Sequence, residues 1–504
     1  MGIQNDEALF AGPLYHDHPP DMRFRAFKRD VPLMLLSYLG TAKTLLYSGI
    51  FRIFHSGIWQ LRIPVILIGA ATIGVLALLF RKTAGNVAAV TACALLVLDP
   101  LFLLTTTFDW GPTALQHLTF GSALVLLIYA CRNQSPLAAA LGCFAAGFGM
   151  WDKALFVWMG SGAALAALLL YSRSLRCFLN RRMIGAGLLG FIIGASPLIL
   201  YNIRQPLKTF QGNFKFAPSE AGRKAQFLKW CLSGAGLYGY IAGEEWMERP
   251  RPPRTELENL SVAVRQKAGE RRLSIFFWVF AAAAASTPLW PRQRRAMTFA
   301  LITMAVAWVQ MAFNLETGGG VHHVVLLWPA PQFVVGAAVA GLADRLRVWA
   351  PRLARPAIAG LVLVFCGSNL LVLNQYFSQF VTMGAVGGWT DAIFPLARYL
   401  DQNARGIVFS ADWGMVDGLV LLSEGRRNFG AADAVLMQDP AAEGTRKVLL
   451  WMLTQPSALF VTHTAKYEIN TGVKQRLYDV DAAIRQATDT VFQQKIFFEV
   501  MKQF

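Results

Sequence analysis

LRIPVILIGAATIGVLALLFR, residues 61–81, decides the fold, because the run is apolar over almost its whole length. A run of this length can cross the hydrocarbon core of a bilayer as one α-helix, which needs about 20 residues. Nine further apolar runs follow, and some are short enough to require tilt, burial between neighbours or a broken helix. They are residues 84–107, 113–131, 136–150, 155–171, 183–203, 273–290, 297–313, 321–343 and 356–376.

The composition of the whole chain agrees with this pattern. Of the 504 residues 55% are hydrophobic and only 15% are charged, and the mean hydropathy is +0.41. These values are far from those of a soluble enzyme of this length. The sequence therefore predicts a polytopic α-helical membrane protein with about ten spanning helices.

The basic residues predict how these helices are oriented. The net charge is +17, but Lys and Arg stand in short clusters beside the apolar runs, which indicates orientation and anionic lipid contact and excludes nucleic-acid binding. Every second loop carries such a cluster and is predicted to be cytoplasmic: Arg81-Lys82, Arg132, 173–182, 292–295 and 345–355. The remaining segments are predicted to lie outside: 1–60, 109, 151–153, 204–272, 314–323 and the chain after 377. Loop 204–272 is itself basic, but it exceeds the length over which the charge rule holds.

The six cysteines predict neither a disulfide nor a metal framework.

Residues 33–51, LMLLSYLGTAKTLLYSGIF, have polar residues on one half of a helical wheel. This pattern predicts a helix lying in the membrane interface with Lys43 at the level of the headgroups. The alternative is a first spanning helix with the basic residues of segment 23–29 on its cytoplasmic side. In the first interpretation residue 1 is already outside, which predicts either a further helix upstream or unaided export of a short tail.

The chain changes character at about residue 385. Short β-type runs at 406–410, 458–462 and 495–501 alternate with helical stretches at 391–404, 442–454 and 473–487. The predicted organisation is a first outer loop with an interfacial helix (1–60), a transmembrane helical domain (61–376) and a small outer α/β domain (385–504). We find no phosphate loop, nucleotide fingerprint or His/Cys metal spacing in the last of these.

Acidic residues are the first candidates for chemistry. Asp6 and Glu7 are adjacent carboxylates on the predicted outer side, and Asp109 in FDWGP links two spans on the same side. Together they can take a proton from a hydroxyl group or hold a cation. Asp109 can equally cap the helix that begins at Pro112, and Asp99, an acid inside an apolar run, can equally cap the helix that Pro100 begins.

The other candidates are charged or titratable groups near the outer interface. Asp152 and Lys153 can bind substrate or simply pair with each other. His322 and His323 follow a Gly-rich segment, and adjacent helical residues point about 100° apart, so one of them is expected to face a cavity. Lys43 is either an anchor or the partner of a lipid-linked phosphate. Arg204, at the outer end of the 183–203 run, completes the candidate substrate-binding set.

These motifs together resemble the phospholipid-carrier-dependent glycosyltransferases of the membrane-embedded C-type fold. The nearest groups are the family 39 protein mannosyltransferases and the bacterial transferases that place 4-amino-arabinose on lipid A. The resemblance rests on Asp6-Glu7, SYLGTAKTLLY at 37–47, LDPLF at 98–102, FDWGPTALQHL at 108–118, Trp-Asp-Lys at 151–153, the Gly-rich His-His segment at 318–323 and the C-terminal domain.

The resemblance implies an inverting transfer of a sugar from a polyprenyl-phosphate donor to a glycan, lipid or protein acceptor. Asp6 would be the general base, Glu7 its neighbour, Asp109 the second acidic site and Lys43 the partner of the donor phosphate. No tightly bound cofactor is implied, and Asp6 and Asp109 would hold a divalent cation if one is needed. The implied location is the bacterial inner membrane, with an extracytoplasmic active site. The departure from the family pattern is the missing helix before Asp6.

Two other functions fit parts of the sequence. Ten spans with the intramembrane Asp99 are compatible with a transporter or lipid flippase, although we find no internal repeat of the kind that such proteins usually carry. A non-catalytic relative with a truncated N-terminus is the third possibility.

Overall fold

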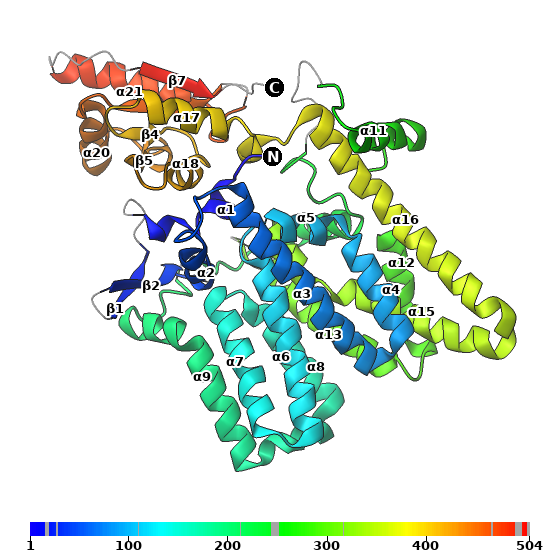
Figure 1. Cartoon of the computed structure of the whole chain (residues 1–504). Helices are drawn as coiled ribbons and strands as arrows, with labels where there is room; N and C mark the ends of the chain where they lie inside the picture. Colours follow the sequence, from blue (N-terminus) through cyan, green and yellow to red (C-terminus); the bar gives the residue numbers. More distant parts are fainter. Residues whose placement is uncertain are drawn as a thin grey trace.

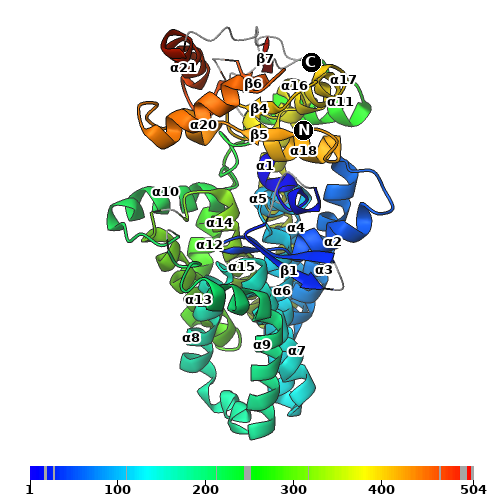
Figure 2. The ribbon, with the colours of Figure 1, turned by 90° about the vertical axis from the view of Figure 1, so that its left-hand side faces the viewer.

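The computed structural model describes residues 1–15, 20–26, 29–108, 110–211, 213–242, 251–315, 317–464, 467–488 and 496–500. A bundle of long helices forms one part, and a small α/β unit lies at one end of it, with the N-terminal segment between the two (Figures 1 and 2). The N-terminus lies at this end (Figure 1).

Among the described residues, seven helices are long and apolar enough to cross a membrane. They are α3 (Ile58–Ala84), α6 (Thr113–Asn133), α8 (Phe156–Leu175) with the 3-10 turn η2 (Arg176–Leu179), α9 (Arg181–Arg204), α13 (Arg294–Ala312), α14 (Val321–Val324) continued by α15 (Ala330–Trp349), and α16 (Pro351–Met383). The pair α4 (Asn86–Val97) and α5 (Pro100–Phe108) is an eighth candidate, bent by 63°. The predicted runs 136–150 and 273–290 form shorter helices, α7 (Pro136–Asp152) and α12 (Phe276–Ala285), so length alone supports fewer than ten spans.

The bend between α4 and α5 follows from two adjacent residues. Pro100 has no N–H to donate, so the helix is interrupted before it. The Asp99 carboxylate accepts a hydrogen bond of 2.9 Å from the Phe102 N–H and so caps the new helix. The second half of the broken run thereby turns away from the axis of the first.

The N-terminal segment corrects the prediction of an interfacial helix over residues 33–51. Residues 29–36 form a strand, β2 (Arg29–Leu36), between β1 (Met22–Ala26) and β3 (Leu39–Gly40) in an antiparallel sheet. Only α2 (Ala42–Ile50) is helical, which is too short to span a membrane, so the alternative of a first spanning helix is also excluded.

Two contacts explain this difference. At Gly40 a Cβ atom would lie 2.2 Å from the carbonyl oxygen of Trp151, so the chain can pass α7 here only as glycine. Trp151 also donates through its indole N–H to the carbonyl oxygen of Leu33 at 2.8 Å, within the strand. Lys43 is 1% exposed, with its ammonium group over the ring of Phe10, and so is buried within the protein instead of lying among headgroups.

The C-terminal unit follows the predicted elements closely. Its helices are α17 (Ile393–Asn403), α18 (Val416–Ser423), α19 (Asp433–Leu436), α20 (Glu443–Thr454) and α21 (Val473–Thr488). Its strands β4 (Val408–Ser410), β5 (Phe429–Ala431), β6 (Leu459–His463) and β7 (Ile496–Val500) form a parallel sheet in the order β5-β4-β6-β7. The sequence analysis predicts alternating strands and helices in this unit, but not the parallel pairing of the strands or the elements β5, α18 and α19.

Two further features complete the fold. The long loop after α9 carries α10 (Ala221–Leu232) and α11 (Glu256–Ala268), and α11 packs against α16. Cys131 and Cys177 form a disulfide with Cα atoms 5.5 Å apart, which the sequence analysis did not predict. The two residues are 46 positions apart and meet only because α6 and α8 end side by side.

The fold generates a labelling test of the orientation. Glu443, on α20 of the α/β unit, and Gln134, the residue that follows α6 of the bundle, are both exposed. We expect Glu443→Cys to react with an impermeant thiol reagent added outside intact cells and Gln134→Cys to react only after the membrane is opened. The wild-type protein is the control for labelling of the native cysteines. Reaction of Gln134→Cys with reagent added outside intact cells would overturn the predicted orientation of the helices.

Candidate active site

The Asp6 carboxylate is held by a short helix and one tryptophan at the end of the bundle nearest the α/β unit. Helix α1 (Asn5–Ala8) carries Asp6, and the side-chain oxygen of Gln4 accepts a hydrogen bond of 2.6 Å from the Asp6 N–H. The indole Nε1 of Trp110, between α5 and α6, donates to Asp6 Oδ2 at 3.1 Å. A charge-assisted hydrogen bond of this kind fixes the direction of the carboxylate.

Two lysines act on this carboxylate. Burial raises the pKa of Asp6 above its ordinary value of 3.8, while the hydrogen bond from Trp110 and the charges of Lys153 and Lys43 oppose the rise without cancelling it. Both lysines are buried, with 2% and 1% of their surface exposed. Asp6 therefore accepts a proton more readily than an ordinary aspartate does, which suits a general base.

Lys153 approaches from the end of α7. Its main chain pairs with Leu39, and the N–H of Ala154 donates to the carbonyl oxygen of Tyr38 at 2.9 Å. At Gly111 the backbone φ is +72°, and a Cβ atom there would lie 3.2 Å from Lys153 Nζ. Glycine thus allows both the left-handed backbone and the close approach of the ammonium group to the loop of Trp110.

Lys43, on α2, packs against two aromatic rings. Its Nζ is 3.9 Å from the centre of the Phe10 ring and 5.8 Å from that of Tyr47. The faces of aromatic rings are electronegative, so they offset part of the cost of burying the ammonium group. α2 brings this cation close enough to act on Asp6.

The two histidine rings pack on each other, with their centres 4.0 Å apart, but each also contacts a different tryptophan. The His322 ring lies 4.8 Å from the Trp110 ring and thus faces the Asp6 cluster. His323 accepts a hydrogen bond of 3.2 Å at Nδ1 from the Gly318 N–H, and its ring lies 6.1 Å from that of Trp158. His322 is therefore the one that shares a wall with Asp6.

Glu7 points away from Asp6 and is already engaged. Its carboxylate accepts two hydrogen bonds from Arg62 on α3, of 2.6 and 3.0 Å, and only 2% of the residue is exposed. Arg62 Nη2 also donates to the carbonyl oxygen of Gly2 at 2.7 Å. The geometry gives Glu7 an anchoring role, although the sequence analysis placed it among the catalytic candidates.

Three other candidates lie outside this cluster. Asp99 accepts hydrogen bonds from the Phe102 N–H and, at 3.0 Å, from Gln332, which matches its alternative role as a cap. Asp152 is buried and accepts from Gln116 at 2.9 Å. Arg204 is exposed at the end of α9. Asp109 falls outside the described residues.

The sequence analysis did not name the aromatic residues of the site as functional candidates. Trp110 also packs on Tyr240 at 5.1 Å and on Trp389 at 6.1 Å between ring centres, and the Tyr240 hydroxyl donates to the Gly319 carbonyl oxygen at 3.3 Å. A tryptophan in a loop between two apolar runs beside an aspartate is the signal that could have found Trp110. Tyr240 and Trp389 carry no such signal, since each comes from a distant segment.

The described residues hold no group of three His, Cys, Asp or Glu side chains that could bind a metal ion. Because Asp109 lies outside that set, a cation between Asp6 and Asp109 stays a prediction. The described residues thus bring together the Asp6 carboxylate, the two lysine ammonium groups and the aromatic rings around Trp110. These groups can accept a proton from a hydroxyl and stabilise a phosphate oxygen.

Comparison with known proteins gives a family match over part of the chain and a shared fold over most of it. Residues 43–201 match the family model described as dolichyl-phosphate-mannose-protein mannosyltransferase. No curated protein matches the chain. The structure is similar to that of ArnT from Cupriavidus metallidurans in the apo state (TM-score 0.55, 16% identity, 91% of this chain and 89% of that one). It is also similar to ArnT bound to undecaprenyl phosphate (TM-score 0.54, 14% identity, 85% and 82%). The predicted resemblance is confirmed, by the family model over residues 43–201 and by the shared fold over most of the chain.

The ion pair of Glu7 generates a stability prediction. We expect Glu7→Gln to lower the free energy of unfolding by about 3–5 kcal/mol, because it leaves the buried guanidinium of Arg62 without its counter-charge. Thermal unfolding in detergent measures the effect. The matched control is Glu443→Gln, which removes an exposed pair with Lys447 and should change little. Equal melting temperatures for the two variants would contradict the anchoring role.

Proposed function

We propose that the protein is a membrane-embedded glycosyltransferase that moves a sugar from a polyprenyl-phosphate donor to an acceptor hydroxyl, with Asp6 as the general base. The observation that carries this proposal is the Asp6 carboxylate, oriented by Trp110 and flanked by the buried Lys153 and Lys43. The family-model match includes both lysines and the Trp110 loop, and it supports a lipid-linked sugar as the donor class.

The proposed reaction is a single displacement. The acceptor hydroxyl gives its proton to the Asp6 carboxylate while its oxygen forms a bond to the anomeric carbon. The bond from that carbon to the donor phosphate breaks, the electron pair stays on the phosphate oxygen, and the configuration inverts. A phosphate leaving group needs little protonation, but it does need positive charge, which Lys153 and Lys43 supply.

The remaining parts of the proposal concern location and partners. The basic clusters put the Asp6 end of the bundle on the extracytoplasmic face, and the inner membrane of a bacterium is the proposed location. The partners are the bilayer, the lipid-linked donor and a glycan, lipid or protein acceptor. Transport is less well supported, because both carboxylate oxygens of Asp99, on which that hypothesis rests, accept hydrogen bonds within the helix packing.

Loss of the base is the direct test. We expect Asp6→Asn to reduce transfer from a polyprenyl-phosphate sugar by at least about 10²-fold, since the amide cannot accept the proton. Melting temperature should stay near that of wild type because the residue keeps its shape. Asp391→Asn, at an exposed position of the α/β unit, is the matched control. Wild-type turnover in Asp6→Asn would remove Asp6 from the mechanism.

The pH profile gives an independent test of the same residue. Asp6 must be ionised to act, so transfer should fall as the pH drops through its raised pKa, at a pH above 3.8. Trp110→Phe removes a hydrogen bond that lowers this pKa, so the acidic limb of kcat/KM should move to higher pH. Trp413→Phe, in the α/β unit, should leave the limb in place. If the acidic limb of kcat/KM stays at the same pH in Trp110→Phe, the limb reports the ionisation of a group other than Asp6.

A further inference from the structure

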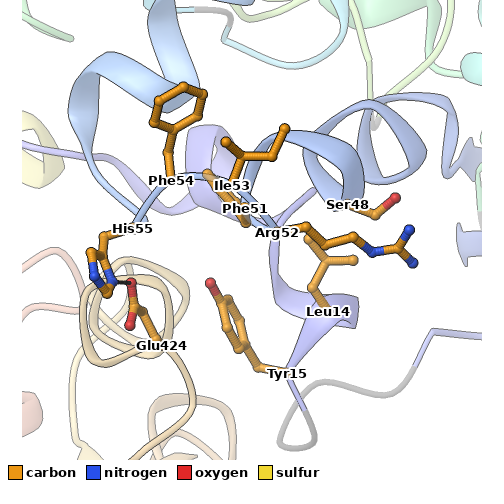
Figure 3. A pocket seen from close by; sticks show the side chains of 9 residues that line it. All are labelled: Leu14, Tyr15, Ser48, Phe51, Arg52, Ile53, Phe54, His55 and Glu424. Atoms are coloured by element: carbon orange, nitrogen blue, oxygen red, sulfur yellow. Dashed lines mark hydrogen bonds and ion pairs between the residues drawn. The ribbon is translucent and has the colours of Figure 1, made fainter.

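A cavity separate from the Asp6 site lies where the loop after α2 meets the α/β unit (Figure 3). Its volume is about 530 Å³, which is within the range of small-molecule sites. It is lined by Leu14, Tyr15, Ser48, Phe51, Arg52, Ile53, Phe54, His55 and Glu424. None of these residues belongs to the Asp6 cluster.

The position of the cavity points to the membrane surface. Helix α3 begins at Ile58 and is the most apolar candidate span, so the loop before it lies where the chain enters the bilayer. Ile53, Phe54 and Trp59 are 77%, 56% and 69% exposed around this point. Exposed apolar side chains in one place mark an interaction surface, and tryptophan is enriched at membrane interfaces. Acyl chains are the partner that such a rim fits.

Of the charged groups that line the cavity, Glu424 is paired and Arg52 is available to bind an anion. Glu424 accepts from the Ser56 N–H at 2.9 Å and from His55 at 3.1 Å, and its other oxygen accepts from Arg426 at 2.8 Å. Burial opposes ionisation of Glu424, but these partners hold its pKa below the ordinary value. The carboxylate is therefore satisfied by its own neighbours. Arg52 is exposed and forms no ion pair within the described part of the chain.

The groups around the cavity suit a phosphate. The Tyr15 hydroxyl points into the space between Phe51 and His55, whereas the Arg52 guanidinium extends away from it, on the side of Ser48 (Figure 3). A guanidinium group and hydroxyl groups are the usual donors to phosphate oxygens in proteins. The charge that remains after Glu424 is paired is positive, which complements an anionic headgroup.

We propose that this cavity is a binding site for an anionic phospholipid. The headgroup phosphate lies against the Arg52 guanidinium, and the acyl chains lie over Ile53, Phe54 and Trp59. Because Glu424 joins the α/β unit to Ser56, a bound lipid contacts both parts of the molecule. This inference concerns a site distinct from Asp6 and does not depend on glycosyl transfer.

The test is lipid binding to delipidated full-length protein in detergent. Phosphatidylglycerol should be retained in native mass spectra and should raise the melting temperature, and phosphatidylcholine should do so much less. Arg52→Gln should weaken phosphatidylglycerol binding by at least about tenfold, the effect of losing one charge-assisted contact. Arg398→Gln, an exposed arginine of α17, is the matched control and should bind as wild type does. Equal binding by Arg52→Gln and wild type would overturn the proposal.

Further experiments distinguish a lipid headgroup from free phosphate as the ligand, and the cavity from the Asp6 site. Phe54→Ser should weaken phosphatidylglycerol binding through loss of the apolar rim. Inorganic phosphate that stabilises the protein as strongly as the lipid does would exclude a role for the acyl chains and overturn the lipid assignment. Asp6→Asn should bind phosphatidylglycerol normally, so failure of the proposed reaction would leave this result unchanged.

Discussion

The contact between Arg62 and the N-terminal segment is the constraint on which the site depends. One guanidinium group binds both the Glu7 carboxylate and the Gly2 carbonyl, and so attaches the first turn of the chain to the most apolar helix. The Gly2 N–H donates to Trp389 in turn, and α1 packs against α18. The first eight residues thus lie between the bundle and the α/β unit. Asp6 meets Trp110 because this segment cannot move away.

Hydrophobic periodicity predicts what is local in this fold. The apolar runs become helices, and the alternation after residue 385 becomes the parallel sheet, because one-dimensional patterns set both. Residues 33–51 show the limit of such reasoning. Their pattern is helical, but strand pairing with β1 and the passage of Gly40 past Trp151 override it as far as Thr41. The pairing with β1 is a local hairpin, but the contact of Gly40 with Trp151 joins segments more than 100 residues apart, which no local pattern reports.

The site shows a second limit, which concerns neighbours in the sequence. Asp6 and Glu7 are chemically alike and adjacent, yet one is oriented by Trp110 and the other is paired with Arg62. His322 and His323 pack on each other, yet the His322 ring also contacts Trp110 and the His323 ring Trp158. Motif reasoning points to such pairs but cannot divide the roles between their members, because the direction of the backbone decides which neighbours each side chain meets. The division becomes visible only when the partner segments are in place.

Stability and chemistry are therefore joined in the same few residues. A buried ammonium group is costly unless other groups compensate for its lost water. Lys43 is compensated by the ring of Phe10, and both lysines lie near the charge of Asp6. Displacing the N-terminal segment would remove the base and also expose the cations that assist it. A substitution that keeps the shape of this segment can separate the two effects, whereas one that detaches it cannot. The cost of burying two cations explains why so short a segment is bound by so many contacts.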